Sequence, residues 1–514
     1  MAEDKQNNAR VAKNAVALTL RMIVVTIVGL YTSRVVFNQL GDINYGIYGV
    51  VGGILGFMSF LTASMSGATS RFITYEIGVG NDNKINEIFN SSFLIHSAIA
   101  LIVILVGETF GVWFLNNILV IPPERLNAAW WVFQFSIISS AISITQVPYT
   151  AVIMAYEKMN IYAYFEIFNV TAKLIIVYLL SISHFDKLVT YSFLLLIVST
   201  IMAFSYRLYC RHTFTITKLK MAHNYDTVKS MLSFSGMDLY GNISVTLNNQ
   251  GLTYAINIFF GVIYNAAVNL ASTVNGMLLS LTTNIAIAFR PQIIKQYAQG
   301  NIKAMENVMC NSVKFTLISM ALLAVPCFIE ADFILRLWLG TVPSYSVEFL
   351  RIIIIQSFFP IINNVCNTAI HANGDIKALT YINGTIFLIL PVIIFVAFHF
   401  GASALWGYGI EISGMIAIVI SAVLIIKKLI PLFYIVKFVY TIILSFSIII
   451  LSVIPTTMVH LLLEEGLLRV VSVSIIYILF SSAGCWFLIL SKDNRIWLKS
   501  KVNKLIREVC LIRR

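Results

Sequence analysis

Charged residues are scarce in this chain of 514 residues, because Asp, Glu, Lys and Arg together make up only 11% of it. Hydrophobic residues account for 59%, and the mean hydropathy is +0.86. A water-soluble globular protein of this length would need far more polar surface, so the composition excludes that class. The sequence instead predicts an integral membrane protein.

Short segments of alternating polarity, which are typical of a transmembrane barrel, are also lacking. Apolar runs of about 20 residues recur instead, each long enough for one membrane-crossing helix. The sequence therefore predicts an all-α polytopic membrane protein with about 14 transmembrane helices, and no loop of more than roughly 25 residues leaves room for a soluble domain. The expected spans are 14–38, 44–66, 89–114, 129–153, 161–182, 189–210, 232–260, 263–289, 312–334, 347–370, 378–399, 404–426, 433–456 and 467–490.

Motifs for cofactor chemistry and catalysis are missing as well. The sequence has six cysteines, none in a predicted outer loop, so we expect no disulfide framework. It contains no phosphate-binding G-x-x-x-x-G-K-[ST] loop, no Cys/His cluster with metal-ligand spacing, and no nucleophile elbow or H-E-x-x-H. We therefore expect no cofactor, no metal site and no catalytic residues. A membrane-embedded transferase and a non-transporting scaffold stay as rivals to a transporter.

Positive charge is plentiful, with a formal net charge of +12. If both termini are cytoplasmic, about 26 of the 35 Lys and Arg residues fall on the inner side, as the positive-inside rule requires. The excess charge therefore predicts orientation in the membrane and does not predict a nucleic-acid partner. The basic tail, 491–514, is expected to lie in the cytoplasm, either as an amphipathic helix on anionic lipids or as a topology signal alone.

The sequence contains an internal repeat with an offset of 220 residues. Gly80 and Asn81, after the second span, match Gly300 and Asn301, after the eighth. Because six spans separate the two copies, both halves would enter the bilayer in the same direction, as a parallel repeat. The predicted domains are an N-terminal lobe (1–220), a C-terminal lobe (221–428), two appended spans (429–490) and the basic tail (491–514).

Cations inside predicted spans are the first candidates for a binding site. A charged side chain in the hydrocarbon region is costly, so it faces other protein or water, or reaches the interface. Lys173 lies near the middle of span five, where it needs a cavity or a carboxylate partner. Arg21 lies about two turns from the inner end of span one. Arg290 ends a polar stripe along span eight that includes Asn269, and span seven carries a second stripe that includes Asn249.

Carboxylates inside spans are fewer. Asp238, Glu166 and Glu411 are the main ones, and each is a candidate site for a coupling proton or sodium ion. An equally good interpretation is that each one pairs with a nearby cation.

Several segments together resemble a known group of transporters. They are "QLGDINYGIYGVV", "SRFITYEIGVGN", "FFGVIYNAAVNLAS", "RPQIIKQYAQGN", "LWLG" and "IHANGDIKA". With two six-span halves and two extra spans, the chain resembles the multidrug/oligosaccharidyl-lipid/polysaccharide (MOP) exporter superfamily, and within it the bacterial polysaccharide (O-antigen type) flippases.

The resemblance implies a V-shaped pair of lobes around a central cavity, with alternating access moving a lipid-linked sugar from the inner to the outer leaflet. It implies that cavity cations hold the diphosphate or acidic sugars, here at Arg21, Lys173 and Arg290. It also implies that spans thirteen and fourteen provide a groove for the lipid tail.

We therefore expect a flippase for an undecaprenyl-diphosphate-linked oligosaccharide in the bacterial inner membrane, serving export of surface polysaccharide such as the O-antigen of lipopolysaccharide. The expected partners are this substrate, H⁺ or Na⁺ as coupling ion, membrane lipids and other polysaccharide-assembly membrane proteins. Asn249 and Asn269 would contact sugar hydroxyls. The alternatives are a cation-coupled multidrug exporter of the same fold and a flippase for the peptidoglycan lipid precursor.

Overall fold

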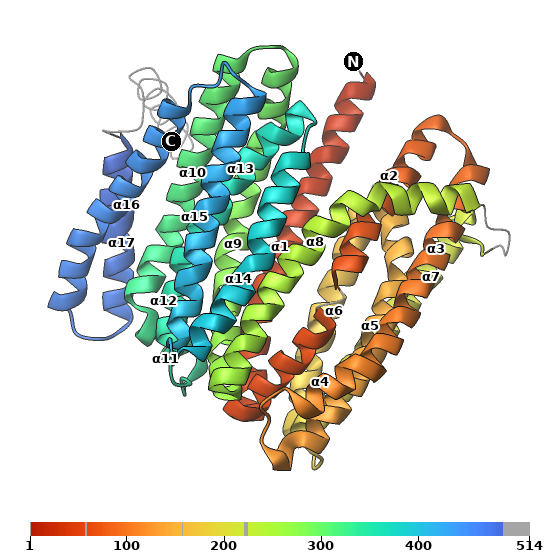
Figure 1. Cartoon of the computed structure of the whole chain (residues 1–514), viewed down its shortest axis with the longest axis horizontal. Helices are drawn as coiled ribbons and strands as arrows, with labels where there is room; N and C mark the ends of the chain where they lie inside the picture. The colour runs from red at the N-terminus through yellow and green to blue at the C-terminus, as the bar shows by residue number, and fades with distance from the viewer. Residues whose placement is uncertain (1, 57–58, 157, 220–224, 487–514) are drawn as a thin grey trace, which may run out of the picture. The chain divides into compact units, whose positions relative to one another are not determined.

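The computed structural model describes residues 2–56, 59–156, 158–219 and 225–486. This part of the chain is helical and has no β-strand (Figure 1). Its α-helices are α1 (Ala2–Gly56), α2 (Ser59–Val79), α3 (Asp82–Val106), α4 (Val112–Asn117), α5 (Leu126–Ala155), α6 (Met159–Ile182), α7 (Lys187–Thr213), α8 (Tyr225–Phe260), α9 (Val262–Ala298), α10 (Ile302–Ile329), α11 (Ala331–Leu339), α12 (Ser346–Gln356), α13 (Phe358–Asn373), α14 (Lys377–His399), α15 (Ala404–Leu429), α16 (Ile435–Leu462) and α17 (Leu467–Gly484).

Most of these helices are built to cross a membrane. Among the described residues, 11 helical segments are both long enough and apolar enough to span a bilayer. The other three expected spans, 14–38, 44–66 and 232–260, fall on α1, α2 and α8, which are helical where the structure describes them. The prediction of an all-α, polytopic membrane protein is therefore confirmed.

Glycines with positive φ mark the turns between spans. Gly41 interrupts α1 with φ 75° and ψ 172°, so the segment Ala2–Gly56 contains the first expected span and the beginning of the second. Gly261 adopts φ 83° between α8 and α9, 220 positions later. Gly80 and Gly300, another pair with this offset, adopt φ 79° and φ 70°. Only glycine enters this region of φ without steric cost, so the same conformational requirement explains the glycine at each of these four positions.

The two halves of the repeat also start their third spans in the same way. Asn81 caps α3 by accepting a hydrogen bond from the backbone N–H of Lys84 at 3.1 Å. Asn301 caps α10 by accepting one from the N–H of Ala304, also at 3.1 Å. A side-chain oxygen in this position satisfies an N–H that the helix leaves free. The repeated sequence therefore has repeated local structure, and the lobe limits at residues 220 and 428 stay a prediction.

The chain forms two compact units, which we call the first unit and the second unit. The first contains residues 1–274, 338–352 and 377–414, and the second contains 275–337, 353–376 and 415–514. Four helices, α9, α11, α12 and α15, contribute to both units.

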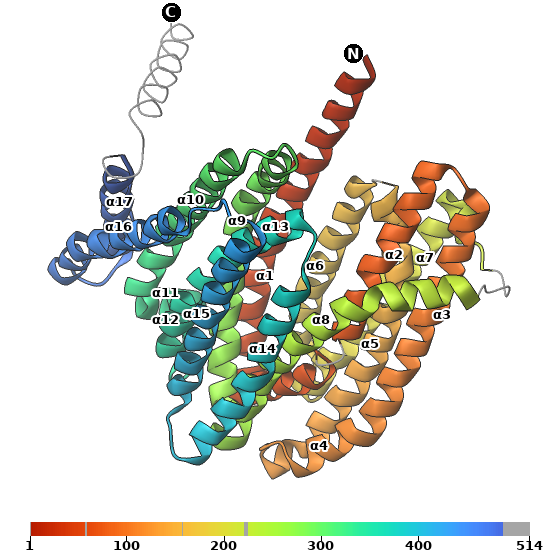
Figure 2. The ribbon, with the colours of Figure 1, turned by 45° about the horizontal axis from the view of Figure 1, so that its top comes forward.

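Within the first unit α5 packs on α7, α8 on α14, and α1 on α6. Within the second unit α10 is the central helix, packed against α13, α16 and α17 (Figure 2). Five cysteines lie in the described residues and all are free, namely Cys210, Cys310, Cys327, Cys366 and Cys485.

Candidate functional site

A cavity opens between α9 and α13 in the second unit. Its volume is about 310 Å³. One arginine, one histidine, two asparagines and one threonine provide its polar groups, and the lining residues are Arg290, Ile294, Asn364, Asn367, Thr368 and His371.

Helical spacing explains why these side chains meet. On α13 the lining residues Asn364, Asn367, Thr368 and His371 follow one another at intervals of three, one and three, which places them on one face. The helix ends immediately afterwards at Gly374, which adopts φ 91°. The opposite wall is α9, whose two lining residues are one helical turn apart.

Among the described residues, Arg290 has one hydrogen-bond partner in the cavity. One of its terminal nitrogens, Nη2, donates to Oδ1 of Asn364 at 2.7 Å. Thr368 donates its hydroxyl to the backbone carbonyl of Asn364 at 2.9 Å, which fixes the same turn of the helix. A guanidinium carries five N–H donors, and Arg290 is exposed, so it has donors left for a ligand.

The cavity also contains an unused acceptor. Oδ1 of Asn367 is buried and has no hydrogen-bond partner in the part of the chain that the structure describes. A buried polar atom of this kind usually has a function or an unseen partner. A permanent cation, an imidazole, two amides and a hydroxyl together suit an anion, such as a phosphate or carboxylate, that also carries sugar hydroxyls.

The second predicted cation, Lys173, lies on α6 in the first unit. Its side chain is exposed and forms no hydrogen bond or ion pair with any described residue. Glu166, seven positions earlier, is the charged group with which it interacts electrostatically. The two groups therefore lie on one helix without forming a direct pair.

A buried carboxylate lies between α15 and α8 in the first unit. Oε2 of Glu411 accepts a hydrogen bond from Nδ2 of Asn248 at 3.0 Å, and the two residues are only 1% and 2% exposed. Oε1 of Glu411 and Oδ1 of Asn248 have no hydrogen-bond partner among the described residues. Two unpaired acceptor oxygens in a buried site are the arrangement that a proton or a small cation would satisfy.

The predicted asparagines have different surroundings. Asn249 is exposed on α8, as a ligand-binding residue requires. Asn269 is half-buried on α9, with its amide nitrogen in the space that a Cβ on Gly49 of α1 would occupy. Asn265, at the start of the same stripe, is fully buried and donates to the backbone carbonyl of Thr253 at 2.9 Å. The stripe along α9 therefore begins with packing residues and becomes exposed only further on.

Two predicted site residues cannot be placed in this way. Arg21 on α1 and Asp238 on α8 have side chains outside the described part of the structure. Of the described set, Arg290 belongs to the second unit, and the others belong to the first, namely Lys173, Glu166, Asn249, Asn269 and Glu411. Their roles in binding and coupling stay predictions.

The sequence analysis missed the four cavity residues on α13 and the partner of Glu411. The four were not singled out as site residues, although their spacing along one helix face could have been recognised, namely Asn364, Asn367, Thr368 and His371. The sequence analysis singled out Asn249 and missed its neighbour Asn248. Asn248 could have been recognised because Ser244, four positions earlier, places a second polar side chain on the same helix face.

The described residues contain no group of three or more His, Cys, Asp or Glu that could hold a metal ion. The fold is similar to that of several solved membrane transporters. An inward-facing multidrug resistance transporter of the MATE family has a TM-score of 0.69 and 14% identity, over 82% of this chain and 99% of that one.

The lipid II flippase MurJ, in an inward closed conformation, also has a TM-score of 0.69, with 15% identity over 93% of this chain and 100% of that one. A MOP superfamily transporter from Pyrococcus furiosus, whose binding pocket is described as having reverse polarity, has a TM-score of 0.60 and 14% identity over 81% of this chain and 96% of that one. The MatE family model matches residues 240–396. No curated protein matches the sequence. All three structures are named as transporters or flippases, and none as an enzyme.

Proposed function

We propose that this multi-pass membrane protein is a flippase that moves an undecaprenyl-diphosphate-linked oligosaccharide from the inner to the outer leaflet of the bacterial inner membrane by alternating access. The product would supply surface polysaccharide, such as O-antigen. Both termini would be cytoplasmic.

The observation that carries the proposal is the cavity between α9 and α13. It combines Arg290, which is still free to bind an anion, with amide and imidazole groups that suit a glycan. In the predicted orientation, α9 and α13 each have one end on the cytoplasmic side of the membrane. The diphosphate of the substrate would enter from that side. A bare diphosphate cannot cross the hydrocarbon region, so a cationic, hydrated binding site is the physical requirement for transport.

The charge of the cavity favours a flippase over a drug exporter. An exporter of organic cations would need carboxylates and aromatic rings in its binding site. The polar groups of the cavity between α9 and α13 instead suit an anion.

Coupling to an ion would take place at Glu411. Its buried carboxylate and unpaired Oε1 support H⁺ or Na⁺ binding in the first unit. Glu166 and Asp238 stay as further candidates.

The test is translocation of a fluorescent lipid-linked oligosaccharide by the purified protein in liposomes. Arg290→Ala should lower the rate about 10- to 100-fold, because a hydrogen bond to a charged group contributes roughly 1.5–3 kcal/mol. Lys295→Ala is the matched control, since it removes one exposed cation from the same helix without touching the cavity. Equal rates for both variants would rule out the cavity as the headgroup site.

Deletion in the native cell separates the rival functions. The proposed flippase predicts that complete lipid-linked repeat units accumulate on the cytoplasmic leaflet. Loss of resistance to organic cations without a change in glycan would identify a multidrug exporter. Accumulation of the peptidoglycan lipid precursor would identify a flippase of that second kind.

A further inference from the structure

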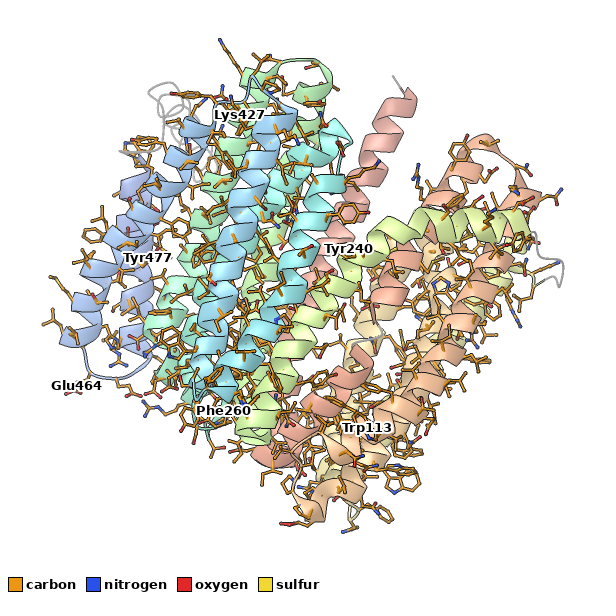
Figure 3. All side chains as sticks on the ribbon, in the orientation of Figure 1. Trp113, Tyr240, Phe260, Lys427, Glu464 and Tyr477 are labelled. Carbon is orange, nitrogen blue, oxygen red and sulfur yellow. The ribbon has the colours of Figure 1, made fainter. Side chains whose placement is uncertain are left out.

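The two C-terminal helices of the described chain, α16 and α17, form a hairpin that is attached to α10 at both ends. All three helices belong to the second unit, and they pack side by side (Figures 1 and 2). In Figure 3, Lys427 and Glu464 are labelled at opposite ends of this unit. Lys427 precedes α16, and Glu464 lies in the loop between α16 and α17.

The first attachment lies at the start of α10. Glu306 is 4% exposed, and its Oε1 forms an ion pair with Nζ of Lys437 at 2.9 Å. Its Oε2 accepts a hydrogen bond from the backbone N–H of Tyr434 at 3.0 Å, just before α16 begins. Lys437 also donates to the side chain of Asn307. We call these contacts the inner clamp.

The second attachment lies at the opposite end of α10. Glu330 follows the last residue of the helix and has a side chain that is 0% exposed. Its Oε1 lies 2.6 Å from Nδ1 of His460, in the last turn of α16. Its Oε2 accepts a hydrogen bond from Nε of Arg469 on α17 at 3.1 Å and forms an ion pair with Nη2 of the same residue at 2.9 Å. We call this the outer clamp, and Arg336 of α11 adds an ion pair to Glu465 in the hairpin loop at 2.9 Å.

The distance between the clamps determines what they can restrain. Glu306 and Glu330 are 24 positions apart, which corresponds to about 36 Å along a helix. One attachment would leave the hairpin free to pivot, whereas two attachments this far apart also fix its tilt. A slide by one helical turn, about 5.4 Å, would break both clamps and leave two buried carboxylates unpaired.

The first half of the internal repeat contains a contact that corresponds to the inner clamp. Asn86, which is 220 positions before Glu306, donates its amide to the backbone carbonyls of Ile216 and Lys218 at 2.6 and 2.8 Å. In each half, therefore, the same position holds the segment that follows the sixth helix of that half. The second copy replaces a neutral amide by a carboxylate paired with Lys437.

We infer that the α16–α17 hairpin is a fixed extension of the body around α10, locked by an ionic clamp at each end, and that it does not move against α10 during transport. The inference holds for any transported substrate. The hairpin is then a static structural element, and it does not open or close the transport path.

Distances between spin labels test this directly. One label pair, Lys303→Cys with Leu432→Cys, reports on the inner end, and another, Leu337→Cys with Leu461→Cys, on the outer end; all four positions are exposed. The six native cysteines are replaced by serine. Both pairs should give one narrow distance distribution that does not change between about pH 5 and about pH 8, or on addition of Na⁺.

The clamp variants complete the test. The double variant Glu306→Gln and Glu330→Gln should broaden both distributions. The charge exchange Glu306→Lys with Lys437→Glu restores the ion pair but provides no acceptor for the N–H of Tyr434, so it should broaden the inner distribution less than the double variant does. If the double variant does not fold, Lys437→Ala serves, because that side chain is 43% exposed, and it should broaden the inner pair alone. Two populations in the otherwise unchanged protein, or no broadening when the clamps are removed, would overturn the inference. Neither readout depends on the identity of the substrate.

Discussion

Glu411 of α15 and Asn248 of α8 form a buried hydrogen bond of 3.0 Å between residues 163 positions apart in the chain. One oxygen of each side chain has no hydrogen-bond partner within the described ranges of the chain. Replacing Glu411 by Gln keeps an acceptor for Asn248 but removes the group that can bind a proton or pair with a cation. The protein should therefore fold normally.

Ion coupling should be lost in Glu411→Gln. Translocation driven by an imposed proton or sodium gradient should fall to the level seen without a gradient, while gradient-independent exchange continues. The measurement is flux into liposomes with and without the gradient. Glu348→Gln, which neutralises an exposed carboxylate, is the matched control and should keep the response. A full gradient response in Glu411→Gln would show that coupling occurs elsewhere.

Asn364 is expected to orient the guanidinium of Arg290. Asn364→Ala removes the acceptor for Nη2 and lets the arginine adopt other rotamers. Translocation should fall about 3- to 10-fold, corresponding to the roughly 1 kcal/mol that a typical hydrogen bond contributes. Arg290→Ala should cause the larger loss, and the two changes together should cost no more than Arg290→Ala alone. Additive losses would mean that Asn364 acts independently of the arginine.

A close approach of α1 and α9 should make Gly46 intolerant of a side chain. A Cβ at Gly46 would lie 2.1 Å from the backbone oxygen of Val262, which cannot rotate away. Gly46→Ala should therefore destabilise the protein by about 1–3 kcal/mol. Gly52→Ala is the control on the same helix, because nothing lies within 4 Å of its Cβ. The control should be neutral or slightly stabilising, and thermal unfolding in detergent measures both. Equal melting temperatures would contradict the close approach.

The loop between α6 and α7 should contribute stability that depends on pH. Burial raises the pKa of Asp186, but the guanidinium of Arg125 and the backbone N–H groups of Val189 and Leu188 outweigh burial, so the pKa lies below its ordinary value of 3.8. The contribution is therefore fully present above about pH 4 and is lost as the pH falls through the lowered pKa.

Asp186→Asn keeps a capping oxygen for α7 but removes the charge. At neutral pH it should cost about 0.2–1 kcal/mol, because the pair Arg125–Asp186 is partly exposed and screened by water. The difference from the unsubstituted protein should shrink as the pH falls toward about 3. Thermal unfolding across this range measures it, and a difference that grows on acidification would refute the assignment.

Local patterns were enough to predict the membrane-spanning helices, because each span is specified by about 20 consecutive apolar residues. The repeat could be recognised for the same reason, since the turns at Gly41 and Gly261 require glycine whatever surrounds them. Stripes of polar residues were less informative. Asn265 and Arg290 lie on one predicted stripe of α9, yet the first is buried in a hydrogen-bond network and the second is exposed.

The sequence by itself determined that the chain is helical, crosses the membrane many times and repeats a six-span plan. Tertiary structure alone decided that Arg290 meets Asn364, 74 positions away, and that Glu330 meets His460, 130 positions away. The physical reason is that helix formation and membrane insertion depend on neighbouring residues, whereas such pairs depend on which helix faces pack together. That choice is made by the shapes and polar groups of several helices at once, and no single stretch of sequence contains it.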